Sequence, residues 1–482
     1  MRLDRLLDAV EVIRLDGDPA TDVVDVTYTS TAARRGSLFC CLRGKRADGH
    51  DHAPDAVERG AVALLVERVL DLPDLPNLPG QPVTQVQVRD TRAALGPIAA
   101  AFYGSPSSSL DVVGITGTNG KSTTAMLVQS ILDHTGRRCG LIGTMNSART
   151  TPEAPDLQAR LAAFVEDGMN AAALEVSSVG LEQRRVDAVH FAVAVFTNLS
   201  PDELAIHGSM DAYFAAKATL FEPGRAEVGV VNADDEWGAQ LLASARIPMR
   251  AFSLADAVDL DVSRATSTFT WRGARVHLRK GAAYNVMNAL AAATAAAELG
   301  VDVAAIAGAL SSIAALPGHG EDVDAGQPFR VVVDYAHTAA ALAAVLDACR
   351  AQTDGEGARV IVVFGSGGDR DASRRALMGD AAARHADVVV VTSDNPRNEP
   401  PMAIVDAIVE GAKAHAGDRS DLRVEVDRRA AIELALREAK PGDVVVVAGK
   451  GHERGQEVAG ETLPFDDREV ALTVLAALGY HS

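Results

Sequence analysis

Residues 111–124 read DVVGITGTNGKSTT, and this stretch decides the fold of the chain. The β-branched run at 112–115 predicts a buried strand, and the apolar spacing after Ser122 predicts an amphipathic helix that ends at Gly136. Small residues between a strand and a helix let backbone N–H groups face an anion, and the helix N-terminus adds the positive end of its dipole. The stretch therefore predicts a phosphate-binding loop.

Lys121 and Ser122 are the residues of this loop that carry chemistry. In such loops the lysine reaches the terminal phosphates and the serine hydroxyl binds Mg²⁺. The strict motif has a glycine five positions before Gly120, where this chain has Ile115. A glycine turn followed by a solvated lysine is the alternative, but the strand before the loop and the helix after it favour nucleotide binding.

The composition describes a large acidic globular protein. A chain of 482 residues is too long for one hydrophobic core, so several domains are expected. The formal charge of −19 argues against broad binding to nucleic acid or to an anionic membrane. No apolar run approaches the length of a membrane span, and the N-terminal residues do not read as a signal peptide. The four cysteines fit neither a zinc site nor a disulfide framework, so a reducing cytoplasm is the simplest interpretation.

Alternating strand and helix patterns predict an α/β protein of three domains. The first series of short elements ends at the GSPSSS joint (104–109), after a proline-rich stretch at 70–82 that predicts a surface loop. A second series follows, and a third begins after the string LPGHGE. We expect a small N-terminal α/β domain at 1–104, a central ATP-binding domain with a parallel sheet at 105–320, and a C-terminal Rossmann-like domain at 321–482.

Two residues of the central domain are candidate functional residues because of their positions in predicted elements. Glu175 ends a predicted strand, where it could hold Mg²⁺ opposite Ser122 or simply cap the next helix. Lys217 lies on a predicted helix among apolar neighbours. The ordinary interpretation is that its apolar stem packs on these neighbours while its charged amine reaches solvent. The alternative is that Lys217 is semi-buried, neutral and reactive.

Three strand-end loops of the last domain carry charged residues, in the strings GSGGDRD, SDNPR and GKGHE. Arg397 could bind a carboxylate through its planar guanidinium, and Glu453 could bind an ammonium, so the pair would suit a zwitterionic amino acid. Unrelated surface charges are the alternative for any one loop. Because all three loops follow strands of one predicted sheet, a shared pocket is favoured. His207 and His337 lack the companion ligands of a zinc site.

Nine strings of this sequence are distinctive, namely GITGTNGKSTT, RTTPEAPDLQ, LEVSSVGLEQRRV, FTNLSPDELAIHGSMDAYFAAKATLF, YNVMNALAA, VVDYAHT, FGSGGDRD, SDNPR and GKGHE. Together they resemble those of the Mur ligases, most closely the MurE type, over nearly the whole chain. The resemblance implies an ATP-dependent ligase that adds an amino acid to UDP-N-acetylmuramoyl-L-alanyl-D-glutamate through an acyl phosphate. SDNPR is similar to the form that accepts meso-diaminopimelate, whose distal carboxylate and amine need Asn and Arg side by side.

The resemblance also implies residue roles, with ATP and Mg²⁺ as cofactors. The catalytic residues would be Lys121, Lys217 and Glu175. The ATP-binding residues would be Gly117, Thr118, Asn119, Gly120, Lys121, Ser122, Thr123 and Asn288. Ser122 and Glu175 would hold one Mg²⁺, and Lys217 would carry a CO₂-derived carbamate that binds a second. The UDP-sugar dipeptide would be held by Ser30, Thr150, Thr151, Ser177, Gln183 and Arg185. The amino acid would be held by Arg370, Asp394, Asn395, Arg397, Gly449 and Glu453.

The chain departs from the family pattern at several positions. Glu203 stands where the family has a His that helps to hold the second metal, so Glu203 is a candidate ligand there. Val179 replaces another usual His, and His319 replaces an Arg that approaches the ATP phosphates. In the first domain, 29–31 reads Thr-Ser-Thr instead of Asp-Ser-Arg, and Ala339 replaces a Pro.

The departures leave two alternatives to a meso-diaminopimelate ligase. One is a paralogue with the same ATP-dependent amide chemistry and a different carboxylate or amine. The other is a nucleotide-binding protein with little or no ligation, kept for interaction or regulation. In each case we expect a cytoplasmic monomer that binds no nucleic acid.

Overall fold

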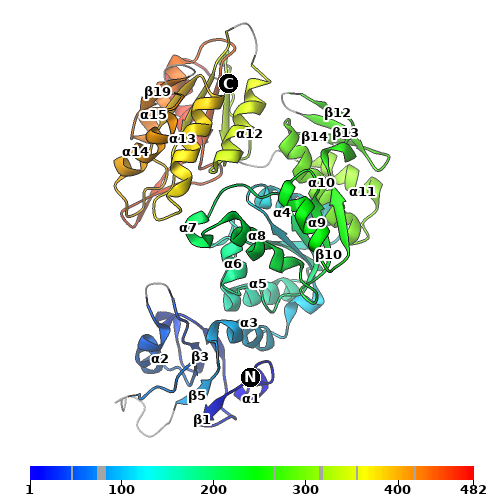
Figure 1. Ribbon diagram of the computed structural model, residues 1–482, viewed down its shortest axis with the longest axis vertical. Coiled ribbons are helices and arrows are strands. Elements are labelled where there is room, and N and C mark those ends of the chain that lie inside the picture. The colour runs from blue at the N-terminus through cyan, green and yellow to red at the C-terminus, as the bar shows by residue number, and fades with distance from the viewer. Residues whose placement is uncertain are drawn as a thin grey trace.

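The computed structural model describes residues 1–44, 47–72, 83–263, 266–313, 318–353, 357–415 and 420–481. Within them, three large sheets with separate hydrophobic cores follow one another along the long axis of the molecule (Figure 1). The expected three-domain α/β fold is therefore confirmed. The proline-rich stretch predicted as a surface loop, 70–82, lies almost wholly outside the described residues.

The N-terminal unit is a sheet of five described strands in the order β1-β5-β4-β3-β2, antiparallel only at β1. The strands are β1 (Arg14–Asp16), β2 (Asp25–Thr27), β3 (Ser37–Cys40), β4 (Ala63–Val66) and β5 (Thr84–Gln87), and the helices are α1 (Leu3–Leu7), α2 (Ala53–Glu58) and α3 (Thr91–Phe102). The Asp90 carboxylate caps α3 by accepting the N–H groups of Arg92 and Ala93. Helix α3 lies against α5 of the central unit and so joins the two (Figure 1).

The central unit is built on a fully parallel sheet of six described strands, in the order β11-β10-β9-β6-β8-β7. The strands are β6 (Asp111–Thr116), β7 (Cys139–Ile142), β8 (Ala171–Glu175), β9 (Phe191–Phe196), β10 (Ala226–Asn232) and β11 (Met249–Phe252). The helices are α4 (Lys121–His134), α5 (Ala154–Glu166), α6 (Ser178–Glu182), α7 (Leu204–His207), α8 (Met210–Ala218), α9 (Glu236–Ser244), α10 (Ala283–Glu298) and α11 (Val303–Ser312). The strand and helix predicted around the phosphate loop are confirmed as β6 and α4, and Gly136 follows the helix with a φ of +82°.

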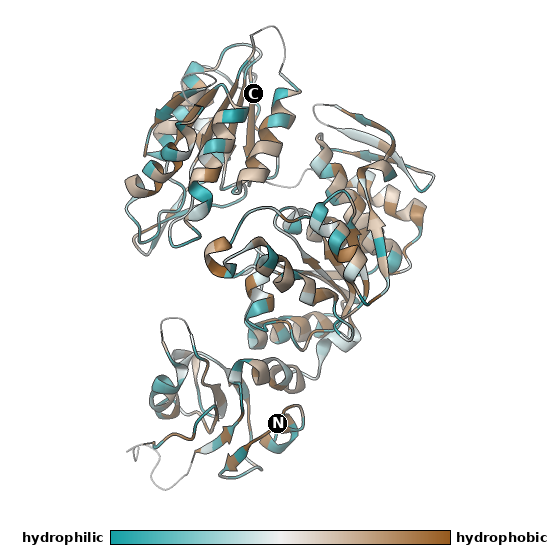
Figure 2. Cartoon of the chain, in the orientation of Figure 1, coloured by the Kyte–Doolittle hydropathy of each residue, from teal (hydrophilic) through white to brown (hydrophobic). Residues whose placement is uncertain are grey.

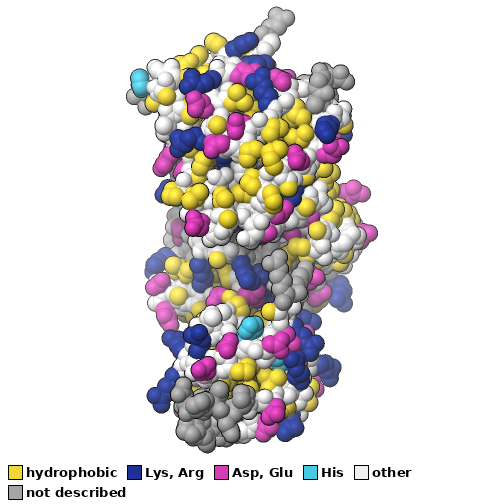
Figure 3. Space-filling model, turned by 90° about the vertical axis from the view of Figure 1, so that its left-hand side faces the viewer, with side chains coloured by type: hydrophobic (Ala, Val, Ile, Leu, Met, Phe, Trp, Pro, Cys, Tyr) yellow, Lys and Arg dark blue, Asp and Glu magenta, His cyan; other side chains and the backbone are white. Residues whose placement is uncertain are grey.

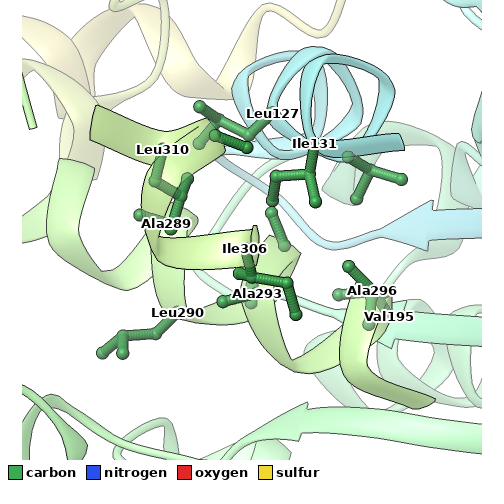
Figure 4. Packing of buried hydrophobic residues seen from close by; sticks show 14 of the residues in the cluster. Leu127, Ile131, Val195, Ala289, Leu290, Ala293, Ala296, Ile306 and Leu310 are labelled. Atoms are coloured by element: carbon green, nitrogen blue, oxygen red, sulfur yellow. The ribbon is translucent and has the colours of Figure 1, made fainter. Parts of the chain in front are cut away.

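Neighbouring residues of β6 point to opposite faces of this sheet, as the pleat requires. Val113 packs with the buried side of α4, α10 and α11, where Leu127, Ile131 and Leu310 meet alanines of α10 (Figure 4). Val112 packs on the other face with residues of α5, α6 and α8. Because both faces are buried, the carboxyl ends of the parallel strands are left as the place for a ligand.

Strands β12 (Val258–Val262), β13 (Ser267–Trp271) and β14 (Ala274–Leu278) form a small antiparallel sheet beside the central one. Strands β13 and β14 form a hairpin. Arg272 and Gly273 turn the chain between these strands with φ values of +47° and +85°.

The C-terminal unit has a sheet of six described strands in the order β15-β16-β20-β17-β18-β19, antiparallel only at β15. The strands are β15 (Glu321–Asp322), β16 (Arg330–Asp334), β17 (Val360–Phe364), β18 (Val388–Val391), β19 (Asp421–Val424), β20 (Val444–Ala448) and the separate hairpin β21 (Gly455–Val458) and β22 (Glu461–Pro464). The helices are α12 (Ala339–Arg350), α13 (Ser373–His385), α14 (Pro401–Ala412), α15 (Arg428–Glu438) and α16 (Asp467–Ala477).

Hydropathy follows this layering, with hydrophobic strands inside and more hydrophilic helix faces outside (Figure 2). One face of the molecule carries Lys and Arg side chains interspersed with Asp and Glu, rather than one extended basic surface (Figure 3). In the described part of the chain, no helix is both long enough and apolar enough to cross a bilayer.

Candidate functional site

The phosphate loop packs tightly against its surroundings at two glycines. Gly117 has a φ of +145°, and a Cβ there would lie 1.9 Å from Thr197 Oγ1. Gly120 has a φ of +84°, and a Cβ there would lie 2.3 Å from Asn288 Oδ1. Only glycine combines these backbone angles with such close approach. The loop that the sequence predicted is thus held by β9 and α10, and Asn288 lies beside it.

Ser122 and Glu175, paired on the sequence as a metal site, do meet. Ser122 Oγ donates a hydrogen bond of 2.9 Å to Glu175 Oε2. Thr144 supports the same carboxylate through its backbone N–H, 3.0 Å from Oε1, and its hydroxyl, 3.3 Å from Oε2. Burial raises the pKa of Glu175, and the charge of Lys121 opposes that rise. A hydroxyl and a carboxylate are hard oxygen donors, so this pair fits Mg²⁺.

Two lysines converge on the same carbonyl of the loop. Lys121 Nζ donates to Gly117 O at 3.0 Å and to Thr118 O at 2.8 Å. Lys217 Nζ donates to Gly117 O at 2.8 Å and lies 4.5 Å from the centre of the Tyr213 ring. Lys217 is only 1% exposed, and burial, with a further contribution from Lys121, lowers its pKa well below the usual range. Lys217 is therefore suited to be a neutral, nucleophilic amine.

These groups line a cavity of about 500 Å³ between the central and C-terminal units. Its wall includes Asp202 and Glu203 from the central unit and Tyr335 and His337 from the C-terminal unit. Burial, reinforced by the charge of Asp202, raises the pKa of Glu203. Among the described residues, no group of three or more His, Cys, Asp or Glu side chains forms a ready metal site. A metal here would need oxygens from a ligand as well as from the protein.

The C-terminal unit touches the rim of this cavity through three contacts. Thr338 Oγ1 donates to Asn119 Oδ1 of the phosphate loop at 2.9 Å. The N–H of Ala205 donates to Asp371 Oδ2 at 3.1 Å. Asp202 Oδ1 lies 3.8 Å from Arg374 Nη1. The segment that runs from Asp202 into α7 and the segment that runs from Asp371 into α13 therefore face each other across the two units.

The residues proposed for the dipeptide substrate fall into two places. The hydroxyl of Thr151 donates to Glu175 O at 2.9 Å, and Ser177 N donates to the Thr151 hydroxyl at 2.9 Å. Arg185 donates to Thr151 O at 2.8 Å and to Gln183 Oε1 at 2.5 Å. Thr150 and Ser177 also line the cavity. Ser30, in the N-terminal unit, does not line it.

The residues proposed for the amino acid form a second cluster on the C-terminal unit, outside the lining of the cavity. Asn395 Nδ2 donates to Glu453 Oε2 at 2.8 Å. Arg397 Nε lies 2.5 Å from Glu457 Oε2, and Arg397 Nη1 donates to Gly368 O at 2.9 Å. The structure thus brings the SDNPR and GKGHE loops together, as predicted.

Asp394, Gly449 and Arg370 complete that cluster. Asp394 Oδ2 is buried and has no hydrogen-bond partner among the described residues. Gly449 has a φ of +112°, and a Cβ there would lie 2.7 Å from Asp394 Oδ2. Arg370 is exposed nearby on the GSGGDRD loop. The unpartnered carboxylate oxygen is the kind of group that receives a ligand cation.

Sequence reasoning missed three residues of these sites. Thr144 lies two residues beyond the end of β7, so the strand-end argument applied to Glu175 could have found it. Asp202 lies in a loop that gives no local signal of its contact with Arg374. Lys450, inside the GKGHE string, is completely buried although its type is normally exposed.

Comparison with known proteins assigns the chain to a family. Residues 23–103 match the Mur ligase family catalytic domain, 115–296 the Mur ligase middle domain, and 321–451 the Mur ligase glutamate ligase domain. The chain is 44% identical to the UDP-N-acetylmuramoyl-L-alanyl-D-glutamate--2,6-diaminopimelate ligase of Streptomyces coelicolor, over 97% of this chain and 95% of that protein. It is 45% identical to the protein of the same name from Streptomyces avermitilis, over 93% and 92% of the two chains.

Comparison with solved structures gives the same family. A UDP-N-acetylmuramoyl-L-alanyl-D-glutamate--2,6-diaminopimelate ligase superposes with a TM-score of 0.66 at 29% identity, over 100% of both chains. MurF from Acinetobacter baumannii shares the fold, with a TM-score of 0.67 at 20% identity over 99% of this chain and 98% of that one. The chain therefore belongs to the Mur ligase family.

Proposed function

We propose that this chain is an ATP-dependent ligase that joins meso-diaminopimelate to the D-glutamate carboxylate of UDP-N-acetylmuramoyl-L-alanyl-D-glutamate, with release of ADP and phosphate. Relatives that carry this name are 36–45% identical to it over 92–100% of its length. The observation that carries the proposal is the pairing of a phosphate loop, placed beside Glu175 and Lys217, with a second cluster that combines Asn395 and Arg397. The first suits a phosphoryl donor and the second an amino acid.

ATP would lie along the phosphate loop in the cavity. The residues proposed to hold it are Gly117, Thr118, Asn119, Gly120, Lys121, Ser122, Thr123 and Asn288, of which all but Gly117 line the cavity. Ser122 and Glu175 would hold one Mg²⁺, which supplies neutralising charge to the phosphate oxygens when it is bound. The backbone N–H groups at the start of α4 would add to the same field.

Lys217 would act as a carbamate. Its neutral amine attacks CO₂, a C–N bond forms, and one proton leaves to solvent, so the side chain becomes a carboxylate. A buried anion beside Lys121 could then take part in binding a second Mg²⁺, together with Glu203. The lowered pKa and the burial of Lys217 support this assignment.

The reaction would proceed in two steps. A carboxylate oxygen of the substrate attacks the γ-phosphorus of ATP, the bond to the bridging oxygen breaks, and ADP leaves. The amine then attacks the acyl carbon, phosphate leaves with the original carboxylate oxygen, and the amine loses a proton as the amide forms. Lys121, as a cation beside the loop, would offset charge on the transferred group. Exclusion of water protects the acyl phosphate from hydrolysis.

The two substrates would bind on opposite sides of the cavity. The residues proposed for the UDP-sugar dipeptide are Ser30, Thr150, Thr151, Ser177, Gln183 and Arg185. The residues proposed for the amino acid are Arg370, Asp394, Asn395, Arg397, Gly449 and Glu453. Since the second group does not line the cavity, closure of the domain at 321–482 onto the domain at 105–320 would bring the amine to the acyl carbon. The N-terminal domain, 1–104, would hold the UDP-sugar.

One assay separates this proposal from its alternatives. Purified protein is incubated with ATP, the UDP-muramoyl dipeptide and either meso-diaminopimelate or lysine, and ADP is measured. ADP release only with meso-diaminopimelate is the expected result. Absence of ADP with either amine would exclude the proposal. Activity with other acids or amines would then indicate a paralogue, and ATP binding without any turnover would indicate a regulatory protein.

A further inference from the structure

Lys450 is a buried cation at the heart of the amino-acid cluster. It follows β20 in the GKGHE string, between Gly449 and Gly451, whose φ values are +112° and +54°. These backbone angles turn the loop so that the lysine side chain points inward, where it is 0% exposed. A buried ammonium is costly unless it is paired and hydrogen-bonded, so its partners indicate what it does.

Both partners of Lys450 belong to the proposed amino-acid pocket. Its Nζ donates to Asn395 Oδ1 at 2.9 Å and to Glu453 Oε2 at 3.0 Å. Asn395 Oδ1 also accepts the N–H of Glu457 at 3.0 Å, while Asn395 Nδ2 donates to Glu453 Oε2 at 2.8 Å. With Lys450 in place, the Asn395 amide has one orientation, and Glu453 is fixed by two donors.

Lys450 also sets the charge of the pocket. Arg397 is paired with Glu457, and the buried Arg428 with Asp467 at 2.7 Å. Lys450 is paired with Glu453.

Asp394 Oδ2 alone among these carboxylates is buried without a hydrogen-bond partner in the described structure. Asp394 therefore keeps one carboxylate oxygen without a hydrogen-bond partner, whereas Glu453 Oε2 accepts two hydrogen bonds. Without Lys450, Glu453 would lose its ion-pair partner and one of these two hydrogen bonds.

We propose that Lys450 is a positioning residue of the amino-acid pocket, which orients Asn395 and Glu453 and neutralises the carboxylate of Glu453. It acts through these residues and does not itself contact the reacting atoms. This inference rests on the proposed function, because it takes the cluster to be the site of the incoming amino acid.

The test is a comparison of Michaelis constants. Lys450→Met keeps the apolar stem but removes the charge and both hydrogen bonds. We expect the KM for meso-diaminopimelate to rise at least about tenfold, because charge-assisted hydrogen bonds are lost, while the KM for ATP changes less than about twofold. Lys413→Met, at an exposed lysine on the same domain, is the matched control and should leave all three substrate KM values unchanged.

A double-mutant cycle adds a readout that a purely structural role would not give. In the Glu453→Gln background, the carboxylate that Lys450 neutralises is absent. Lys450→Met should then raise the KM for meso-diaminopimelate at least about threefold less than it does in the wild type. Equal effects in the two backgrounds, or an equal rise in the KM for ATP, would overturn the positioning role.

A second variant and the wild-type control distinguish failure of this inference from misfolding and from failure of the proposed function. If Lys450→Met does not fold, Lys450→Gln retains a donor for Asn395 without the charge, and the same selective rise in KM is expected. If this variant keeps the wild-type KM for meso-diaminopimelate, the inference fails while the proposed function stands. If the wild type itself releases no ADP with meso-diaminopimelate, both fail.

Discussion

Replacement of Lys217 by Met perturbs the cavity at one buried atom. The Nζ group lies 2.8 Å from Gly117 O and 4.5 Å from the centre of the Tyr213 ring, and the residue is 1% exposed. Burial and the neighbouring Lys121 lower the pKa of Lys217, which favours the neutral amine that the proposed carbamate requires. Met keeps most of the apolar volume but cannot form a carbamate.

The expected loss can be estimated from the group that disappears. Removal of one preorganised electrostatic group at a reacting centre typically costs about 10²–10³ in kcat, or about 3–4 kcal/mol. We expect Lys217→Met to lose at least about 100-fold in kcat. Stability should be kept, because Met removes a polar group that is costly to bury without changing the packing volume much. A thermal unfolding midpoint close to that of the wild type separates this loss from misfolding.

The assay is ADP release in CO₂-depleted buffer, with and without added bicarbonate. The wild type should gain activity when bicarbonate is added, whereas Lys217→Met should not respond. Incubation with ¹³C-labelled bicarbonate should give a carbamate signal in the wild type that the variant lacks. Near-normal turnover of Lys217→Met, or a wild type indifferent to bicarbonate, would refute the carbamate assignment.

Three other substitutions give separate tests. Gly117→Ala places a Cβ 1.9 Å from Thr197 Oγ1 at a φ of +145°, so ATP affinity by calorimetry should fall at least about tenfold; an unchanged affinity contradicts the phosphate-loop assignment. Glu203→His should lower the Mg²⁺ concentration needed for half-maximal rate if Glu203 is a metal ligand, and an identical Mg²⁺ titration speaks against it. Burial lowers the pKa of His337 to about 4, so protons bind the unfolded state first as the pH falls from about 6.5 to 4. As the pH falls over this range, the free energy of unfolding of the wild type, measured by urea titration, should therefore decrease more than that of His337→Gln. A difference in unfolding free energy between the two proteins that does not change with pH would contradict this.

The strand, the glycine turn and the helix of the phosphate loop could be predicted because their signal is local. Gly120, Lys121 and Ser122 follow a strand and open a helix within a dozen residues, so neighbouring positions in sequence are also neighbours in space. The strand-end argument then placed Glu175 correctly, 2.9 Å from Ser122 Oγ, because parallel strands deliver their carboxyl ends to one edge.

Contacts between units could not be predicted in this way. The hydrogen bond from Thr338 to Asn119 joins residues 219 positions apart and depends on how two separately folded units are placed. The same holds for Asp202, which meets Arg374 of the next unit. Lys450 was missed for another reason: burial of a lysine depends on partners that come from several loops, and its own string gives no sign of them.

The departures from the family pattern lie in different surroundings. Glu203 and His319 both line the cavity, and the His319 ring stacks on that of His452, with ring centres 5.7 Å apart. Thr29 and Thr31 are exposed on the N-terminal unit. Under the proposed function, changes at the cavity wall would affect the phosphoryl step, whereas those in the first domain would affect binding of the UDP-sugar. That the chain is a monomer stays a prediction.

The transfer of oxygen from substrate to phosphate tests the central claim most directly. The D-glutamate carboxylate of the UDP-muramoyl dipeptide is labelled with ¹⁸O, and the protein is supplied with ATP and meso-diaminopimelate. We predict one ¹⁸O atom in each released phosphate and one amide product for each ADP, because the carboxylate oxygen leaves with the phosphoryl group. Unlabelled phosphate, or ADP release without amide product, would contradict the account.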